Sequence, residues 1–245
     1  MNRTSLLMAV SATVLALSAP ALGQAPGAPA PARAKVLRYL TPADIDPSRL
    51  IPAPPADGSD VNKAELAELH RLTAGRTIDR FTQAQWDDEH EDWTMYAPTL
   101  GWKFDMATLP ATAEVVAAVT DNASLAATAG KNKFTRKRPW AVDASIPTCD
   151  PDDKPLTSYP SGHATLGYSL GMTLAVLIPE KAPDLMARAD DYAYSREICG
   201  SHYPSDTRAS QALAAAFVTA MLKNPDFQAK LAAAHAELRA AKIAN

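Results

Sequence analysis

The chain has 245 residues, enough for one sizeable domain, and 47% of them are hydrophobic, an ordinary fraction for a globular protein. The formal net charge is −3 at pH 7. Because binding to a polyanion requires a positively charged surface, this balance argues against nucleic acid as a general partner.

Residues 1–23 have the organisation of a secretory signal peptide. Arg3 is their one charged residue, an apolar run covers residues 6–17, and the small residues Ala21 and Gly23 follow. The run is shorter than the about 20 residues of a membrane-spanning helix, which makes a membrane anchor the less favoured alternative. No later segment is apolar for long enough to span a membrane. We predict cleavage after this segment and a periplasmic or secreted protein.

The next segment, residues 24–50, is expected to be a flexible lead-in. It begins QAPGAPAPARA, a composition rich in Pro and Ala without periodicity. A second Pro-rich stretch, IPAPPADGSD, ends in polar residues suited to cap a helix that begins near Val61. We expect residues 51–245 to form one domain.

Beyond these Pro-rich stretches the chain is predicted to be helical, with no run that alternates as strands do. Pro183 is suited to the first turn of a helix, and Leu185, Ala189 and Tyr192 then share one face. Helices are expected over residues 61–90, 111–129 and 163–178, and another is expected to begin at Pro183. A further helix would contain the stripe Leu213, Phe217, Ala220 and Met221, and the last would begin at Pro225 and carry Phe227, Leu231 and Leu238. The predicted fold class is an all-α, single-domain helical bundle.

The two cysteines, Cys149 and Cys199, are predicted to form a disulfide, because an exported protein with an even number of cysteines favours pairing. Such a bridge would stabilise the fold by at most about 4 kcal/mol in the chain-entropy model. Two buried free thiols are the less favoured alternative.

The segment KNKFTRKRP begins at Lys131 and contains the first group of candidate site residues. Lys131 and Arg138 are seven residues apart, a spacing of two helical turns that would place both on one face. Pro139 disfavours helical geometry before it, so Arg138 is expected at a helix end. A solvated basic patch also explains such a run, and the motif is weak by itself.

The segment SYPSGHATLGYS places Ser161, Gly162 and His163 at the start of an apolar helix. Free backbone N–H groups and the helix dipole make such a start a natural site for phosphate, and glycine lets a ligand approach closely. A capping serine beside an ordinary histidine explains the pattern as well, and both interpretations stay open.

The segment SREICGSHYPSD combines Arg196, His202 and Asp206. Arg196 offers a planar fork that matches two phosphate oxygens. Pro204 suits a first helical turn, which places His202 just before the helix and Asp206 within it. A carboxylate bonded to one imidazole nitrogen leaves the other free to attack. A purely structural helix start would leave Arg196 unexplained. Together the three segments suit phosphoryl transfer.

These motifs match K-x6-RP, PSGH and SR-x5-H-x3-D at every fixed position. The sequence therefore resembles the class A bacterial non-specific acid phosphatases, within the superfamily of type-2 phosphatidic acid phosphatases and vanadium haloperoxidases. The segments IPAPPADGS, TSYPSGH, SREICGSH and NPDFQAKLAAAHAEL carry the resemblance over nearly the whole mature chain.

The resemblance implies the all-α fold of that superfamily and hydrolysis of phosphate monoesters without a metal or other cofactor. His202 would form a phosphohistidine, Asp206 would orient it, and His163 would protonate the leaving group. The phosphate would be held by Lys131, Arg138, Ser161, the Gly162 amide and Arg196. Inorganic phosphate or vanadate would inhibit. Transfer of phosphate to other acceptors and self-association into a homo-oligomer stay open, as does the physiological substrate.

The sequence departs from the class A pattern at two places. Tyr203-Pro204 replaces a Trp-Gln pair after the nucleophile, and Ala164 follows PSGH where Thr or Ser is common. Neither change removes a catalytic group, but either could alter substrate fit or rate. The two cysteines also resemble a class A pair, which would tie the loop before PSGH to the loop that bears the nucleophile.

Three alternatives share the signature. Vanadate-dependent peroxidases would use the same residues to bind vanadate, but their chains are much longer than this one. A non-catalytic phosphate-binding protein of the cell envelope would not need two histidines with Asp206. A membrane lipid phosphatase would need transmembrane helices after the signal.

The remaining polar features are expected to be structural. The run DDEHED, residues 87–92, could coordinate a cation through His90, but a solvated acidic turn is favoured. His70 and His235 are interpreted as ordinary helix residues. The sequence contains no GxxxxGK, HExxH or GxSxG motif, which leaves nucleotide triphosphatases, zinc proteases and serine hydrolases without support.

Overall fold

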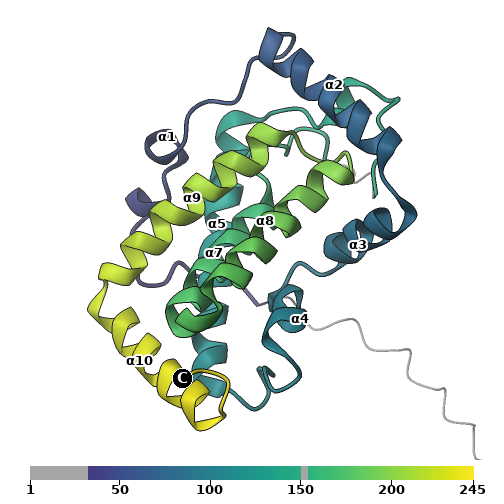
Figure 1. The fold of residues 1–245 in the computed structure, drawn as a ribbon. Helices are drawn as coiled ribbons and strands as arrows, with labels where there is room; N and C mark the ends of the chain where they lie inside the picture. The colour runs from purple at the N-terminus through teal and green to yellow at the C-terminus, as the bar shows by residue number, and fades with distance from the viewer. Residues whose placement is uncertain (1–32, 150–153) are drawn as a thin grey trace, which may run out of the picture. The chain divides into compact units, whose positions relative to one another are not determined.

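The computed structural model describes residues 33–149 and 154–245, and within them every regular element is a helix (Figure 1). This confirms the predicted all-α fold class. The longer helices are α2 (Asp60–Gly75), α3 (Ile78–Glu89), α5 (Pro110–Phe134), α7 (Gly162–Leu177), α8 (Ala182–Ile198), α9 (Pro204–Lys223) and α10 (Pro225–Ala240). Short helical turns are η1 (Pro42–Ile45), α1 (Pro47–Leu50), η2 (Trp93–Tyr96), α4 (Ala97–Leu100), α6 (Pro139–Val142) and η3 (Pro179–Lys181). The predicted signal peptide lies outside the described residues.

Helix α7 is at the centre of the folded unit, where it packs against α5, α8 and α9 (Figure 1). Two glycines permit this close packing. A Cβ on Gly167 would lie 2.8 Å from a ring carbon of Tyr192, and one on Gly171 would lie 2.6 Å from the Tyr96 hydroxyl. The antiparallel helices then bring the first turns of α7 and α9 to the same end as the last turns of α5 and α8.

The predicted helix starts and core faces are largely confirmed. The Ser59 hydroxyl caps α2 by accepting a hydrogen bond from the Asn62 amide. The predicted face of α8 is completely buried, and the predicted core residues of α9 and α10 are buried as well, except for Ala220, which is half-buried. The buried ones are Leu185, Ala189, Tyr192, Leu213, Phe217, Met221, Phe227, Leu231 and Leu238.

Two details of the helix prediction were wrong. The segment 61–90 forms two helices, because the chain is extended at Arg76 and Thr77, where the Thr77 hydroxyl caps α3. Lys131 and Arg138 do not share a helix, because Thr135 adopts a left-handed conformation with φ of 46° and ends α5. Arg138 has extended backbone and immediately precedes α6. The spacing of two helical turns therefore does not explain why these two cations lie together.

Part of the segment predicted as a flexible lead-in is folded. Arg38 and Asn122 exchange two hydrogen bonds, of 3.0 Å from the Arg38 amide and 2.9 Å to its carbonyl. Leu37, Tyr39 and Leu40 pack against the main core, and η1 and α1 follow. The apolar side chains of residues 36–40 explain the difference, because the Pro/Ala composition behind the prediction ends at Ala34.

The predicted disulfide joins Cys149 to Cys199. The Cys149 amide also donates a 3.2 Å hydrogen bond to the Cys199 carbonyl, so the two loops are connected twice. In the described part of the chain, no helix has the length and apolar character required to cross a membrane.

Candidate active site

The three predicted motifs converge on one cavity of about 510 Å³ at the end of the bundle where four helix termini meet. Five predicted site residues line it, namely Lys131, Arg138, His163, Arg196 and His202. Three others lie close by: Asp206 is buried behind His202, Ser161 is buried at the start of α7, and Gly162 borders an adjoining smaller cavity. Residues separated widely in sequence thus form one site.

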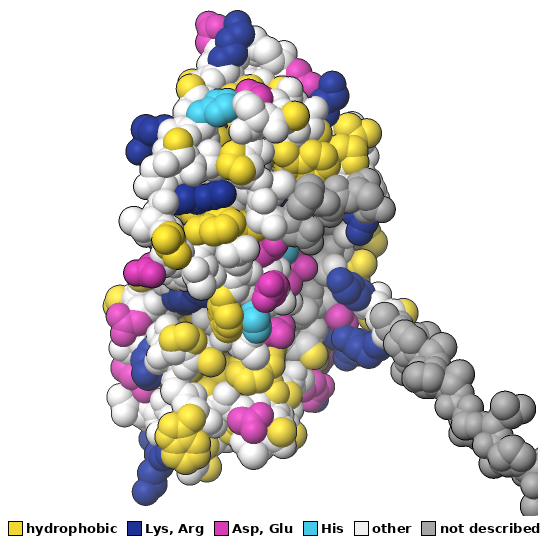
Figure 2. Space-filling view, turned by 90° about the vertical axis from the view of Figure 1, so that its right-hand side faces the viewer, with side chains coloured by type: hydrophobic (Ala, Val, Ile, Leu, Met, Phe, Trp, Pro, Cys, Tyr) yellow, Lys and Arg dark blue, Asp and Glu magenta, His cyan; other side chains and the backbone are white. Residues whose placement is uncertain are grey.

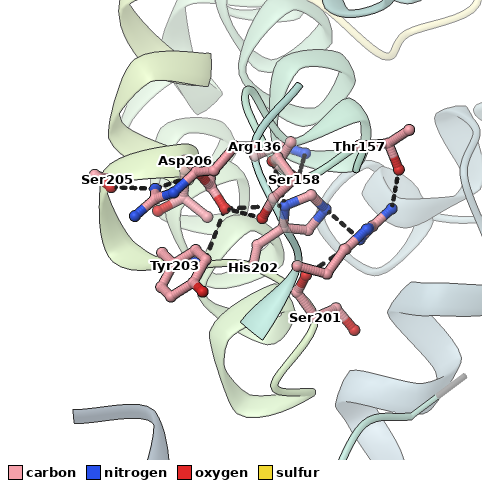
Figure 3. A network of polar contacts seen from close by, with 12 residues as sticks. Arg136, Thr157, Ser158, Ser201, His202, Tyr203, Ser205 and Asp206 are labelled. Atoms are coloured by element: carbon pink, nitrogen blue, oxygen red, sulfur yellow. Dashed lines mark hydrogen bonds and ion pairs between the residues drawn. The ribbon is translucent and has the colours of Figure 1, made fainter. Parts of the chain in front are cut away.

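The His202 ring is held from both nitrogens (Figure 3). Its Nδ1 lies 2.8 Å from the Ser158 carbonyl oxygen and 3.4 Å from Asp206 Oδ2, both of which are acceptors. Its Nε2 lies 2.9 Å from Arg138 Nη1, which can only donate. Nδ1 therefore carries the proton and Nε2 presents its lone pair to the cavity.

The His202 pKa is lowered well below its ordinary value, chiefly because the ring is completely buried and then because Arg138 and Arg196 are close. A neutral imidazole protonated at Nδ1 is the form needed for nucleophilic attack, and in this structure its Nε2 lone pair accepts a hydrogen bond from Arg138.

Asp206 is the hub beneath this histidine. Its carboxylate accepts hydrogen bonds from Arg136 Nη1 at 2.7 Å, the Ser158 hydroxyl at 2.6 Å and the Tyr203 amide at 2.8 Å. Burial raises the pKa of Asp206 to about 6, and Arg136 together with these hydrogen bonds opposes the rise. The nearest acceptor to His202 Nδ1 is the Ser158 carbonyl, so Asp206 shares the orienting position with a backbone group.

Arg136 is a site residue that sequence reasoning missed. Its guanidinium bridges Asp206 and Glu65, at 2.7 and 2.8 Å, and lies 3.9 Å above the Tyr203 ring. The side chain is buried, and it also donates a 2.7 Å hydrogen bond to the Ser205 hydroxyl. Its position inside KNKFTRKRP was a signal, but nothing in the sequence distinguished it from the neighbouring Lys137, which is exposed.

The start of α7 has the predicted form. The Ser161 hydroxyl accepts a 3.3 Å hydrogen bond from the Ala164 amide and caps the helix, a bond that uses a lone pair of the oxygen and not its O–H proton. A Cβ on Gly162 would lie 3.3 Å from both Lys131 Nζ and Glu91 Oε1. Gly162 thus keeps open the space in which these two charged groups approach the helix start.

Two arginines line the cavity beside His202. Arg138 donates to the Ser201 carbonyl at 3.1 Å and to the Thr157 hydroxyl at 3.3 Å as well as to His202. Arg196 Nη1 lies 2.5 Å from Asp88 Oδ1, and only 3% of the residue is exposed. Both guanidinium groups are therefore held at fixed positions, which prepares the cavity for an anion.

His163 lines the same cavity as His202. Its Nε2 donates a 3.0 Å hydrogen bond to the Asp88 carbonyl, so a second proton would bind at Nδ1, which lies 3.8 Å from Glu91 Oε1. Burial and then the charge of Arg196 lower the His163 pKa well below its ordinary value, and the hydrogen bond to Asp88 opposes this.

The acidic run at residues 87–92 is only partly the solvated turn that was predicted, because Glu89, Glu91 and Asp92 are exposed but Asp87 is not. Asp87 is completely buried, where it pairs with Arg188 and accepts a 2.5 Å hydrogen bond from the Ser195 hydroxyl. Asp88, Glu89 and Glu91 line the cavity. The prediction failed for Asp87 and Asp88 because charged residues were assumed to face water, whereas Arg188 and Arg196 of α8 pair with these two.

The other histidines do not join this site. His90 Nδ1 lies 2.7 Å from the Trp86 carbonyl, and its ring stacks on Trp86. His70 Nε2 lies 2.9 Å from Asp143, and His235 is a half-buried residue of α10. Among the described residues, no group of three or more His, Cys, Asp or Glu side chains is placed to hold a metal ion.

Comparison with known proteins points to one family. Residues 111–229 match the model of the PAP2 superfamily. The chain is 30% identical over 204 residues to a protein of Zymomonas mobilis named acid phosphatase, with 80% of this chain and 77% of that protein aligned. It is 29% identical to a non-specific acid phosphatase of Providencia stuartii and 28% identical to one of Salmonella typhimurium, each over more than three quarters of both chains.

Proposed function

The chain belongs to the PAP2 superfamily, and from that premise we propose that it is an acid phosphatase that hydrolyses phosphate monoesters through a phosphohistidine at His202. The observation that carries the proposal is the state of the His202 ring. Its protonated Nδ1 is held by Ser158 and Asp206, and its Nε2 lone pair faces a cavity lined by arginines. The relatives named acid phosphatase support the same reaction class.

The phosphoryl group would be bound by Lys131, Arg138, Arg196 and the free backbone amides at the start of α7, including that of Gly162. Ser161 would donate its O–H to a phosphate oxygen, because the bond from the Ala164 amide uses only a lone pair of that hydroxyl, and its cap would also position the helix start. Binding would move one Arg138 hydrogen bond from His202 Nε2 to a phosphate oxygen, which releases the lone pair for attack.

In the first step, Nε2 of His202 forms a bond to phosphorus as the bond from phosphorus to the ester oxygen breaks. The ring gains a positive charge, which Asp206 and the Ser158 carbonyl stabilise through Nδ1–H. In the second step, water attacks phosphorus, the P–N bond breaks, and inorganic phosphate and neutral His202 are regenerated. The fixed arginines would stabilise the equatorial oxygens in both steps.

His163 would donate a proton from Nδ1 to the leaving oxygen, since Nε2 is already bonded to Asp88. Burial and, after it, the charge of Arg196 lower the His163 pKa and keep the ring neutral in the free enzyme. A bound phosphate dianion would offset those cations and raise the His163 pKa, so the substrate itself would prepare the general acid. In the second step the deprotonated His163 would accept a proton from the attacking water.

Tyr203-Pro204, where the sequence departs from the class A pattern, lies in the part of the structure that holds Asp206. Tyr203 is completely buried beneath Arg136, and its amide donates to Asp206. Pro204 is the first residue of α9. The pair would therefore affect how firmly Asp206 is held, while substrate contacts come from other residues. The predicted signal peptide remains the basis for proposing export to the periplasm or the medium.

The test is hydrolysis of 4-nitrophenyl phosphate by the mature chain, with and without EDTA, alongside His202→Ala and the control His235→Ala. Samples quenched with detergent at alkaline pH during turnover of phosphorus-labelled substrate should contain protein-bound label that is stable to base and released by acid, as a phosphohistidine requires. Turnover that survives EDTA and vanishes only in His202→Ala supports the proposal. Full activity in His202→Ala, or activity lost with EDTA, would overturn it.

A further inference from the structure

One side of the cavity is acidic. Asp88, Glu89 and Glu91, from the end of α3 and the residue pair that follows it, line the same space as the four cations Lys131, Arg138, Lys154 and Arg196. Figure 2 shows Asp and Glu side chains gathered near the middle of one face, next to histidine side chains. Asp88 holds Arg196 in place, but a carboxylate that pairs with none of the cavity arginines would repel a bound phosphate.

The three carboxylates are not equivalent. Asp88 is committed to Arg196 through the 2.5 Å ion pair, and 16% of its side chain is exposed. Glu91 is 51% exposed, and its Oε1 lies 3.8 Å from His163 Nδ1. Glu91 is thus the acidic group that faces both the solvent-accessible mouth and the proposed proton donor.

An independent observation fixes where an anion would lie. Arg196 is almost completely buried and lines the cavity, yet within the described residues its Nε has no hydrogen-bond partner. Buried donors of this kind normally have an acceptor, and because Arg196 also lines the cavity, an anion bound there would supply one. The cavity therefore has a cationic end at Arg196 and Arg138, beside the neutral His202, and an acidic side at Glu91.

The proposed reaction places the leaving group between these ends. The ester oxygen must lie next to His163 Nδ1 to receive its proton, so substituents one or two carbons away come within reach of Glu91. Residues 88–91 also precede the segment 111–229 that matches the family model. The acidic side is therefore added by a part of the chain outside that match.

We propose that Glu91 selects phosphate monoesters of amino alcohols, by pairing its carboxylate with an ammonium group on the leaving alcohol. This inference rests on the proposed phosphatase function and names its preferred substrate class. The phosphate of such a zwitterionic ester meets the arginines while its ammonium group meets Glu91. An anionic substituent at the same position would be repelled by Glu91 and disfavoured.

The experiment compares three esters of similar size: O-phosphoethanolamine, propyl phosphate and 2-phosphoglycolate, which place an ammonium, a methyl and a carboxylate at corresponding positions. For each, kcat/KM is measured with the unmodified protein, Glu91→Gln and the control Glu114→Gln. Glu114 is a similarly exposed glutamate that pairs with Lys230 away from the cavity. For each protein, kcat/KM is expressed as a ratio between two substrates. When these ratios are compared between variants, the intrinsic reactivity of the esters cancels.

In the unmodified protein we expect kcat/KM to fall in the order ammonium, methyl, carboxylate. Glu91→Gln should lower the ammonium-to-methyl ratio by about fivefold, the size expected for a partly exposed ion pair, and raise the carboxylate-to-methyl ratio. Glu91→Lys should favour the carboxylate ester, and Glu114→Gln should change neither ratio. Unchanged ratios in both Glu91 variants, with normal hydrolysis of 4-nitrophenyl phosphate, would overturn this inference alone. Absence of hydrolysis of every ester by the unmodified protein would instead overturn the proposed function.

Discussion

The two cavity histidines have contrasting environments. His202 is 1% exposed and is bonded at both nitrogens, so its tautomer and orientation are set by the protein alone. His163 has one bonded nitrogen, and its other nitrogen faces a half-exposed glutamate. Under the proposed mechanism the tautomer of the nucleophile His202 is set before substrate arrives, whereas the protonation of the proposed general acid His163 depends on the bound phosphate. The following predictions separate these two situations.

The largest effects should come from removing each histidine in turn. His202→Ala should reduce turnover of every ester by more than about a thousandfold, because the nucleophile itself is lost. His163→Ala should reduce turnover of alkyl phosphates by about 100-fold or more and affect 4-nitrophenyl phosphate far less, because nitrophenolate leaves without a proton. Steady-state kinetics on both esters measure the difference. Equal losses for the two esters in His163→Ala would refute its role as proton donor.

Arg136→Gln should test the support beneath the nucleophile. Without this guanidinium the Asp206 pKa should rise further above about 6, so that Asp206 becomes protonated at higher pH and no longer stabilises the charged ring. We expect kcat to fall by about tenfold at neutral pH with a smaller change in KM, since Arg136 does not line the cavity.

The pH profile distinguishes this effect from simple misfolding. In Arg136→Gln the acidic side of the kcat profile should shift to higher pH, and Arg136→Lys, which keeps the charge but not the fork, should shift it less. Circular dichroism and thermal unfolding check that each variant is folded. An unshifted profile with a uniform loss of activity would indicate that Arg136 supports the fold and not the ionisation of Asp206.

The unmodified protein should have a bell-shaped pH profile. Attack requires neutral His202, and the pKa of this ring is lowered by burial. The fall of kcat/KM on the acidic side that is due to His202 should therefore lie below pH 6.5, with activity lost as the pH falls through the His202 pKa. In the complex, activity should be lost as pH rises through the pKa of His163. NMR titration of the imidazole nitrogens assigns the two groups. A His202 titration at or above pH 6.5 in the free protein would contradict the burial argument.

The contrast between local and long-range information explains what the sequence could predict. Ser161, His163, His202 and Asp206 were placed correctly at their helix starts, because proline, glycine and capping residues act on their immediate neighbours. Lys131 and Arg138 reach the same cavity, but the helix assumed to join them ends at Phe134. The motif was informative even though its predicted geometry was wrong.

The residues that sequence reasoning missed enter the site through tertiary contacts. Glu65 reaches Arg136 from α2, Ser158 reaches both His202 and Asp206, and Glu91 reaches His163 from beyond α3. A charge run such as DDEHED has the same composition whether it faces water or buried arginines, so composition alone could not place it. The folded arrangement of α3 against α8 makes that distinction.

The smallest effect on catalysis should come from removing the disulfide. Cys149→Ser with Cys199→Ser should lower the free energy of unfolding by at most about 4 kcal/mol, because the unfolded chain is no longer constrained. Cys199 precedes His202 by three residues, so any change in the geometry of the site should affect His202 more than His163. Yet the His202 ring is held by Arg138, Ser158 and Asp206, none of which needs the bridge, so kcat should change by less than about twofold. Thermal unfolding and kinetics on the folded double variant measure the two quantities. A large fall in kcat at unchanged stability would show that the bridge itself positions the nucleophile.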